Sequence, residues 1–167
     1  MIPDVSPDLQ QLASQLLRGV AAREWHLGTA ESLTGGMLGA AITAVPGAST
    51  RYAGGIVSYS DQVKKSVLGV PAQILARYGA VSGEVAEAMA RGCQSSLDVE
   101  VALVTTGVAG PASDDRGTAV GTVFIACATP DACVTRLLHL TGDRERIRHA
   151  STRAALELGI ELAEGVA

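Results

Sequence analysis

The apolar residues of the chain recur with two different spacings. A spacing of three to four residues, typical of a helix with one buried face, begins after Ser6-Pro7-Asp8, a run that favours a helix start. The same spacing predicts further helices from about Gly35, from Ser60 to Leu68, from Pro71 to Gly79, after Ser82, and from Thr141 or Asp143. The residues expected to face the core in the longest helices are Leu9, Leu12, Ala13, Leu16, Leu17, Val20 and Ala21, then Val85, Ala86, Met89, Ala90 and Cys93, and finally Ile147, Ala150, Ala154, Leu158 and Leu162.

Short apolar runs between these helices predict five strands. The first ends at Glu31, and the others cover residues 52–59, 99–106, 119–128 and 132–140. The last two are joined near Pro130-Asp131, which favours an antiparallel hairpin. Because the earlier strands alternate with helices, we expect an α/β fold with helices flanking a sheet, and the hairpin makes that sheet mixed. The sequence has no linker, repeat or low-complexity tract, so residues 1–167 are expected to form a single domain.

Composition narrows the class of protein. Apolar residues make up 47% of the chain and charged residues 18%, which is typical of a folded protein with a sizeable core. The 13 basic and 17 acidic residues give a formal net charge of −4, and aromatic residues make up 3%; both values argue against a nucleic-acid partner. No apolar stretch is long enough for a membrane span, and the N-terminus lacks the pattern of a secretory signal.

The cysteines and histidines lack the spacings of known disulfide frameworks and metal sites. They are Cys93, Cys127, Cys133, His26, His139 and His149. An odd number of widely spaced cysteines excludes a complete disulfide framework, and neither a C-x-x-C nor an H-E-x-x-H pattern occurs. We therefore expect a reduced, cytoplasmic protein without a metal site.

Polar residues cluster where the first predicted strand meets the next helix. The cluster consists of Thr29, Glu31, Ser32 and Thr34, followed by Gly35 and Gly36. Backbone N–H groups at a helix N-terminus can bind an anion or a developing oxyanion, and Ser32 would lie beside them. The alternative is that Ser32 or Thr34 simply caps the helix.

A second cluster follows the second predicted strand and contains a candidate base. Tyr59 stands at the strand end, and Lys64 comes four residues after Ser60, on the same helix face. A lysine acts as a base near neutral pH only if its pKa falls from about 10.4, which burial in an apolar pocket can cause. The alternative is that Lys64 and Lys65 are a solvated pair on an exposed face.

Two further groups of residues suit a ligand. The run from Thr105 to Pro111 combines hydroxyls with glycines, which let a ligand approach the backbone closely, although it also suits an ordinary turn. Arg144 and Arg148 are four residues apart at the start of the last helix, a spacing that suits bidentate contacts to a phosphate. Arginines at a helix N-terminus oppose the helix dipole, which hints at a function, although a solvated face is the alternative.

Six runs of residues occur in the order in which one protein family carries them. They are TAESLTGG at 29–36, GGIVSYSDQVKKSVLGV at 54–70, GAVSGEVAEAMARG at 79–92, TTGVAGP at 105–111, VGTV at 120–123 and GDRERIR at 142–148. Together they resemble the CinA C-terminal domain family, the nicotinamide-nucleotide amidohydrolases (NMN deamidases). The resemblance extends from about Leu9 to Leu162. It suggests the stand-alone form, without the molybdopterin-binding-like domain that many members carry.

The resemblance implies a three-layer α/β/α fold with a mixed, mostly parallel sheet. It also implies hydrolysis of the carboxamide of nicotinamide mononucleotide to nicotinic acid mononucleotide and ammonia, without a metal or cofactor. The family's proposed catalytic residues correspond to Ser32 as nucleophile, with Lys64 taking its proton directly or through Tyr59. The residues expected to contact the nucleotide are Glu31, Thr34, Gly35, Gly36, Thr106, Gly107, Gly110, Arg144 and Arg148. A homo-oligomer, with a dimer favoured, is also expected.

The chain departs from the family pattern in one loop and near the candidate base. Many members carry an asparagine near Asp61, and a Gly-Gly run with a later Lys-Pro after the Gly-Pro. Here Thr118-Ala119 stands where Lys-Pro is usual, and Asp114 and Asp115 are placed where they could repel a phosphate. These departures concern ligand affinity and substrate preference more than the fold.

Two other functions compete with the amidohydrolase. One is a non-catalytic nucleotide-binding or partner-interaction domain linked to competence or DNA damage, which the altered loop favours. The other is a reductase with a Tyr/Lys pair, but that chemistry usually requires Tyr-x-x-x-Lys. Tyr59 and Lys64 are five residues apart, and no dinucleotide fingerprint opens the chain.

Overall fold

The computed structural model describes residues 5–165, and within them the helices and strands follow the predicted order. The strands are β1 (Leu27–Glu31), β2 (Tyr52–Val57), β3 (Val101–Gly107), β4 (Thr122–Ala128) and β5 (Cys133–His139). The helices are α1 (Pro7–Ala22), α2 (Met37–Thr43), α3 (Asp61–Ser66), α4 (Ala72–Tyr78), α5 (Gly83–Leu97) and α6 (Arg144–Glu164), with a 3-10 turn, η1 (Ala48–Thr50). The strands predicted at 52–59, 99–106, 119–128 and 132–140 were all longer than the observed ones. β2 stops before the Ser60 cap of α3, and β4 starts only after Gly121, whose φ of +87° is left-handed.

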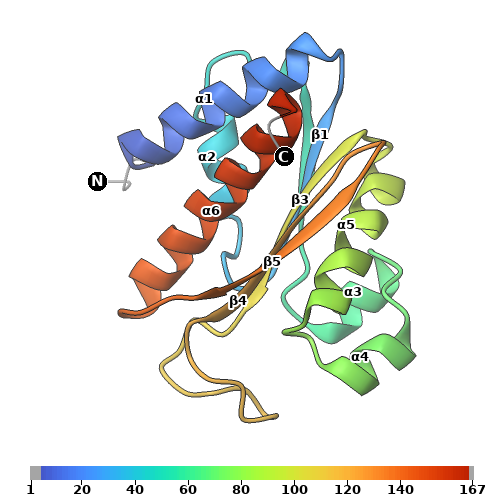
Figure 1. Ribbon diagram of the computed structural model, residues 1–167, viewed down its shortest axis with the longest axis vertical. Helices are drawn as coiled ribbons and strands as arrows, with labels where there is room; N and C mark the ends of the chain where they lie inside the picture. Colours follow the sequence, from blue (N-terminus) through green and yellow to red (C-terminus); the bar gives the residue numbers. More distant parts are fainter. Residues whose placement is uncertain (1–4, 166–167) are drawn as a thin grey trace.

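The strands form one sheet in the order β2-β1-β3-β4-β5. β1 is parallel to both of its neighbours, with Thr29 opposite Gly55 on one side and Leu103 on the other. The β3–β4 and β4–β5 pairs are antiparallel, so β4 alone runs against the other strands. This confirms the mixed, mostly parallel sheet, and Figure 1 shows its three layers: α1, α2 and α6 cover one face, and α3, α4 and α5 cover the other.

Each face of the sheet carries its own apolar core, and the buried residues of the longest helix in each core were predicted with unequal success. The buried residues of α5 are the five expected ones, Val85, Ala86, Met89, Ala90 and Cys93. On α6, however, the expected Ala150, Ala154 and Leu162 are only half-buried, whereas Ser151, Thr152, Ala155 and Gly159 are buried. The reason is that α6 packs against α1 as well as against the sheet, so its buried surface is wider than a single stripe.

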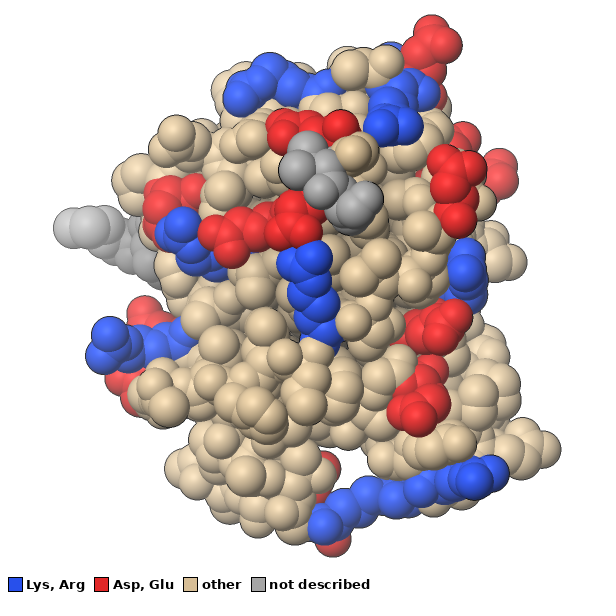
Figure 2. Space-filling model, viewed as in Figure 1, with Lys and Arg blue, Asp and Glu red and all other residues tan. Residues whose placement is uncertain are grey.

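The charges on one face of the molecule and the hydropathy of its described helices bear on the partners it could have. On the face drawn in Figure 2, basic and acidic side chains are intermixed rather than gathered into a patch of one sign. Within residues 5–165, every helix is too short or too polar to span a lipid bilayer.

The connections of β1 and β2 leave the sheet in opposite directions. β1 continues into α2, on the face that carries α1 and α6, whereas β2 continues into α3, on the opposite face. In open α/β sheets, the crevice at the carboxyl ends of two such strands is the usual place for a ligand. The fold therefore points to the segments that follow Glu31 and Val57, which are two of the polar clusters found in the sequence.

Helix α5 approaches the end of α3 very closely at Gly92. A Cβ atom on Gly92 would lie 1.8 Å from the carbonyl oxygen of Leu68 and 2.7 Å from its carbonyl carbon. Leu68 and Val70 are buried in the same core as α5. The contact therefore anchors the segment that carries Lys64, and only glycine leaves room for it.

We expect Gly92→Ala to lower the free energy of unfolding by about 2 kcal/mol or more, because a backbone carbonyl cannot move aside as a flexible side chain can. Helix propensity alone would favour alanine by about 1 kcal/mol, so the sign of the change separates the two effects. Denaturant unfolding measures it. Gly83→Ala is the matched control in the same helix, since its Cβ would meet nothing closer than 3.6 Å. Equal stability of the two variants would contradict the prediction.

Candidate active site

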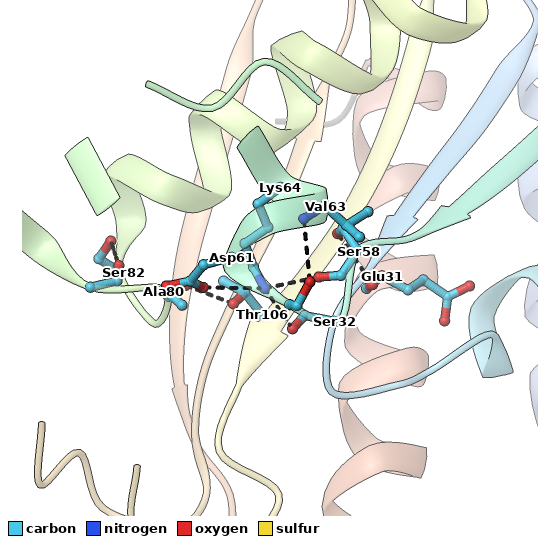
Figure 3. A network of polar contacts seen from close by, with 11 residues as sticks. Glu31, Ser32, Ser58, Asp61, Val63, Lys64, Ala80, Ser82 and Thr106 are labelled. Atoms are coloured by element: carbon cyan, nitrogen blue, oxygen red, sulfur yellow. Dashed lines mark hydrogen bonds and ion pairs between the residues drawn. The ribbon is translucent and has the colours of Figure 1, made fainter. Parts of the chain in front are cut away.

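A buried amine and a serine hydroxyl meet at the carboxyl ends of β1 and β2. Lys64 Nζ lies 3.1 Å from Ser32 Oγ and 2.9 Å from the carbonyl oxygen of Ser58. Lys64 is 1% exposed and Ser32 is 8% exposed. Figure 3 shows the lysine side chain reaching from α3 to both groups. The two residues are therefore in direct hydrogen-bond contact, which is the geometry that proton transfer from a serine to a base requires.

The burial of Lys64 follows from how α3 begins and ends. Ser60 caps the helix by accepting a hydrogen bond of 3.3 Å from the N–H of Val63. Beyond the helix, Leu68 and Val70 enter the core, so Lys64 faces inward while Lys65 remains exposed. The interpretation of both lysines as a solvated pair is therefore wrong for Lys64 and holds only for Lys65.

The surroundings of Lys64 favour its neutral form. Burial lowers the pKa of its ammonium group below the ordinary value, because the charged form loses hydration, while the Asp61 carboxylate opposes this by raising the pKa. The closest Asp61 oxygen is 4.0 Å from Nζ, and Asp61 itself is exposed. A neutral amine has two N–H donors and one lone pair. It can therefore donate to the Ser58 carbonyl and still accept the proton of Ser32.

Ser32 lies in a tight turn that does not use its side chain as a helix cap. Its N–H donates to the carbonyl of Thr105 at 2.9 Å, which ties the turn to β3. The hydroxyl of Thr34 donates to Glu31 and contacts the hydroxyl of Thr105, each at 2.7 Å. The capping interpretation of Ser32 and Thr34 is therefore wrong, and the Ser32 hydroxyl is left to interact with Lys64.

Glu31, expected to contact the substrate, instead satisfies the N-terminus of α2. Its carboxylate, 2% exposed, accepts hydrogen bonds from the backbone N–H groups of Gly36, Leu38 and Gly39 at 3.0, 3.0 and 2.8 Å. The N-cap residue of α2 is Gly36, which has no side chain to do this. Buried N–H groups at a helix start need acceptors, so Glu31 fixes the turn that holds Ser32.

Gly35, Gly36 and Arg148 also belong to this turn rather than to the wall of the cleft. The two glycines have left-handed φ angles of +58° and +101°, which other residues rarely adopt. The guanidinium of Arg148 donates to the carbonyls of Leu33 and Thr34 at 3.0 and 2.7 Å. These positions correct the expectation that Thr34, the glycines and Arg148 bind the nucleotide: none of them is among the residues that line the cleft, and their hydrogen bonds shape the turn instead.

A cleft of about 290 Å³ opens above the serine and the lysine. Of the residues predicted to contact a ligand, those that line it are Ser32, Tyr59, Lys64, Thr106, Gly107, Gly110 and Arg144. The Thr106 hydroxyl donates to the carbonyl of Ala80 at 2.7 Å, so its oxygen can only accept from a ligand. The third polar cluster of the sequence thus forms one wall of the cleft.

Arg144 and Tyr59 line the same cleft and contact each other. Arg144 donates to the carbonyl of Gly110 at 2.7 Å and to the Tyr59 hydroxyl at 2.9 Å. The spacing of Arg144 and Arg148 suggested that both could bind one phosphate, but only Arg144 lines the cleft. Because Lys64 reaches Ser32 directly, proton transfer between them needs no relay through Tyr59.

Sequence reasoning missed two residues of the site. Ser58 acts through its backbone carbonyl, which any residue would supply, so no side-chain pattern could have revealed it. Asp61 belongs to the second polar cluster of the sequence, but no role in the site was predicted for it. Its position three residues before Lys64 on the predicted helix was the signal that places its charge beside the amine.

A model of the CinA C-terminal domain matches residues 9–162 of the chain. The chain belongs to this family. CinA-like proteins of Frankia casuarinae and Geotalea daltonii are 50% and 46% identical to it, over 81% and 78% of its length. The aligned parts cover 31% and 32% of those proteins, so the chain spans about a third of the curated relatives it matches.

Solved structures of the CinA superfamily share this fold across nearly the whole chain. A CinA superfamily protein from Klebsiella pneumoniae matches with a TM-score of 0.90 at 34% identity, covering 94% of this chain and 98% of that one. A competence/damage inducible protein from Agrobacterium tumefaciens matches with a TM-score of 0.91 at 31% identity, covering 96% and 99%. The three-layer arrangement described above is therefore the CinA C-terminal fold.

We expect Glu31→Gln to lower the free energy of unfolding by about 2 kcal/mol, because an amide NH₂ would replace one of the two oxygens that accept buried donors. Denaturant unfolding measures the change. Glu84→Gln is the control: it removes the same charge from the first turn of a helix, but Glu84 is exposed. A loss in Glu31→Gln no larger than in the control would show that the carboxylate does not stabilise the turn.

Proposed function

We propose that this chain hydrolyses the carboxamide of nicotinamide mononucleotide to nicotinic acid mononucleotide and ammonia, with Ser32 as nucleophile and Lys64 as general base. The observation that carries the proposal is the 3.1 Å contact between the Ser32 hydroxyl and an amine whose burial favours its neutral form. Membership of the CinA family is compatible with an amidohydrolase and supports it further. The expectations of a homo-oligomer and a cytoplasmic location stay predictions.

Acylation would begin with proton transfer from Ser32 to Lys64. The lone pair of the neutral amine takes the hydroxyl proton while Oγ forms a bond to the amide carbon, and the carbonyl oxygen becomes an oxyanion. The N–H of Leu33, which has no acceptor within residues 5–165, lines the same cleft and can donate to that oxygen. The ammonium of Lys64 then gives its proton to the amide nitrogen. The C–N bond breaks, ammonia leaves, and an ester on Ser32 remains.

Deacylation would again use Lys64 as the base, in its neutral form. With ammonia gone, the neutral Lys64 amine takes a proton from a water molecule, whose oxygen attacks the ester carbon. The bond to Ser32 Oγ breaks, and the proton returns from Lys64 to the serine oxygen. The products are the carboxylic acid and the regenerated hydroxyl, so the amine is neutral at the start and at the end of each half-reaction.

We expect Ser32→Ala and Lys64→Met each to lower kcat for ammonia release from nicotinamide mononucleotide by at least about a hundredfold. Because the two groups act as a unit, the double variant should lose little more than either single variant. A coupled assay for ammonia measures these rates, and thermal melting checks that the variants are folded.

Lys65→Met is the matched control for the lysine, since it makes the same substitution at the next, exposed position. It should keep nearly full turnover. Near-normal rates in Ser32→Ala or Lys64→Met would remove that residue from the mechanism. Binding of the nucleotide by the unaltered protein without turnover would instead support the alternative, a non-catalytic nucleotide-binding domain.

The pH dependence of kcat should change when Asp61 is replaced by asparagine. Turnover requires neutral Lys64, so kcat should rise as the pH rises through the lowered pKa of that lysine. The Asp61 carboxylate raises this pKa, so Asp61→Asn should lower it further and move the acidic limb of the pH–rate profile to lower pH. Asp131→Asn, at an exposed hairpin position, is the control. An acidic limb that stays in place or moves to higher pH would contradict the assignment of Lys64 as the base.

A further inference from the structure

The loop between β3 and β4 forms part of the wall of the cleft. Gly110, Ala112 and Asp114 of this loop line the cleft. At the start of the loop, the carbonyl of Gly110 accepts a hydrogen bond from Arg144 at 2.7 Å. Beyond this point, residues 112–119 are exposed or half-buried and belong to neither a helix nor a strand. Their position in the wall therefore depends on what holds the tip of the loop.

Arg116 joins the tip of this loop to the C-terminus of α4. Its guanidinium donates to the backbone carbonyls of Leu75 and Arg77, each at 3.3 Å, and also to that of Ala76. In the part of the chain that the structure describes, every other hydrogen bond of residues 112–118 stays inside the loop. Figure 1 shows the loop at the same end of the molecule as α4. The Arg116 side chain is therefore what ties the tip to the rest of the fold.

The local structure on both sides favours this contact. The last carbonyls of a helix lack intrahelical partners and carry a partial negative charge, so a guanidinium beside them is favourable. On the loop side, Asp114 Oδ1 accepts hydrogen bonds from the N–H groups of Arg116 and Thr118 at 3.0 and 2.8 Å, which folds the tip into a turn. On the helix side, the Arg116 side chain lies against Gly79, where a Cβ atom would be 2.7 Å from its Cδ. Both segments are therefore shaped to bring the guanidinium to the helix end.

The contact connects two parts of the cleft wall that are distant in sequence. Ala80 and Val81, which follow α4, line the cleft, and Ala112 and Asp114 line it from the loop. Arg116 is not among the residues that line the cleft; its side chain lines a neighbouring hollow. It can therefore affect a bound ligand only through the two segments that it joins.

We propose that Arg116 is a positioning residue for the reaction: it fixes the β3–β4 loop to α4 and so keeps the wall of the cleft in place around a bound substrate. The proposal rests on the amidohydrolase function proposed above and adds to it a residue that touches neither the substrate nor the reacting atoms. Within residues 5–165, neither Ser32 nor Lys64 makes a hydrogen bond to the loop or to α4. Loss of the contact therefore weakens substrate binding and leaves the chemical step unchanged.

The test compares kcat and KM for ammonia release from nicotinamide mononucleotide in the unaltered protein, in Arg116→Met and in Arg116→Lys. We expect Arg116→Met to raise KM about fivefold and to leave kcat within about twofold, because the lost binding is shared by the ground state and the transition state. Arg116→Lys should recover most of the affinity, since an ammonium group can also donate to the last carbonyls of a helix.

Arg77→Met is the matched control. It makes the same substitution at an exposed position of α4 and leaves the backbone carbonyl of residue 77 in place. It therefore separates the loss of the contact from the loss of a positive charge near the cleft, and it should change neither kcat nor KM.

Hydrogen–deuterium exchange follows the loop without any substrate. The N–H groups of Gly117 and Thr118 donate to the backbone carbonyl and the side chain of Asp114. In Arg116→Met these two amides should exchange several-fold faster than in the unaltered protein, while the amides of α5 keep their rates.

An unchanged KM in Arg116→Met, an equal rise of KM in Arg77→Met, or unchanged exchange in the loop would overturn the proposal and leave the amidohydrolase function intact. Faster exchange in α5 as well would show a general loss of stability and would also overturn it. If the unaltered protein does not hydrolyse the nucleotide, the proposed function fails, and calorimetric Kd values of the same four proteins take the place of KM. A weaker Kd in Arg116→Met alone would then support the role of Arg116, and equal Kd values would overturn it.

Discussion

The site depends on an amine that is removed from water without being given a close counter-ion. Lys64 has a carbonyl at 2.9 Å and a hydroxyl at 3.1 Å, but the nearest Asp61 oxygen is 4.0 Å away. A closer carboxylate would keep the amine protonated and unable to accept a proton. Without the Ser58 carbonyl, a buried N–H would lack an acceptor, which costs about 1–3 kcal/mol. The arrangement avoids both outcomes and leaves one lone pair for Ser32.

Each partner of this contact is held by a different helix on a different face of the sheet. Ser32 is fixed through Glu31, whose carboxylate occupies the N-terminus of α2. Lys64 is fixed through the segment after α3, which α5 can approach only because residue 92 is a glycine. The parallel β1–β2 pair brings the two segments together at one edge. The 3.1 Å contact is therefore a product of the whole three-layer fold rather than of either segment alone.

The sequence pattern was sufficient to predict the helices, the strands and the pair Ser32 and Lys64. It was insufficient to predict what the polar residues around that pair do. Periodicity identified all five buried residues of α5 because that helix packs with a single face. On α6 it identified Ile147 and Leu158 but not the other buried residues, because packing against α1 widens the buried surface. Glu31 and Arg148 were expected to meet a ligand, but each satisfies backbone groups of the Ser32 turn. A charged residue beside a nucleophile has the same spacing in either role, so only the three-dimensional contacts distinguish them.

The contacts divide the site into a part that cannot vary freely and a part that can. The part that cannot vary freely consists of the buried residues Glu31, Ser58 and Lys64. Their hydrogen bonds hold the turn that carries Ser32 and the position of the Lys64 amine. The loop between β3 and β4 is different, because Asp114 and Arg116 stabilise it through hydrogen bonds to backbone groups outside the Ser32 turn. Its exposed positions can change charge without moving Ser32 or Lys64. The fold thus permits the charge of this loop to change while Ser32 and Lys64 keep their geometry.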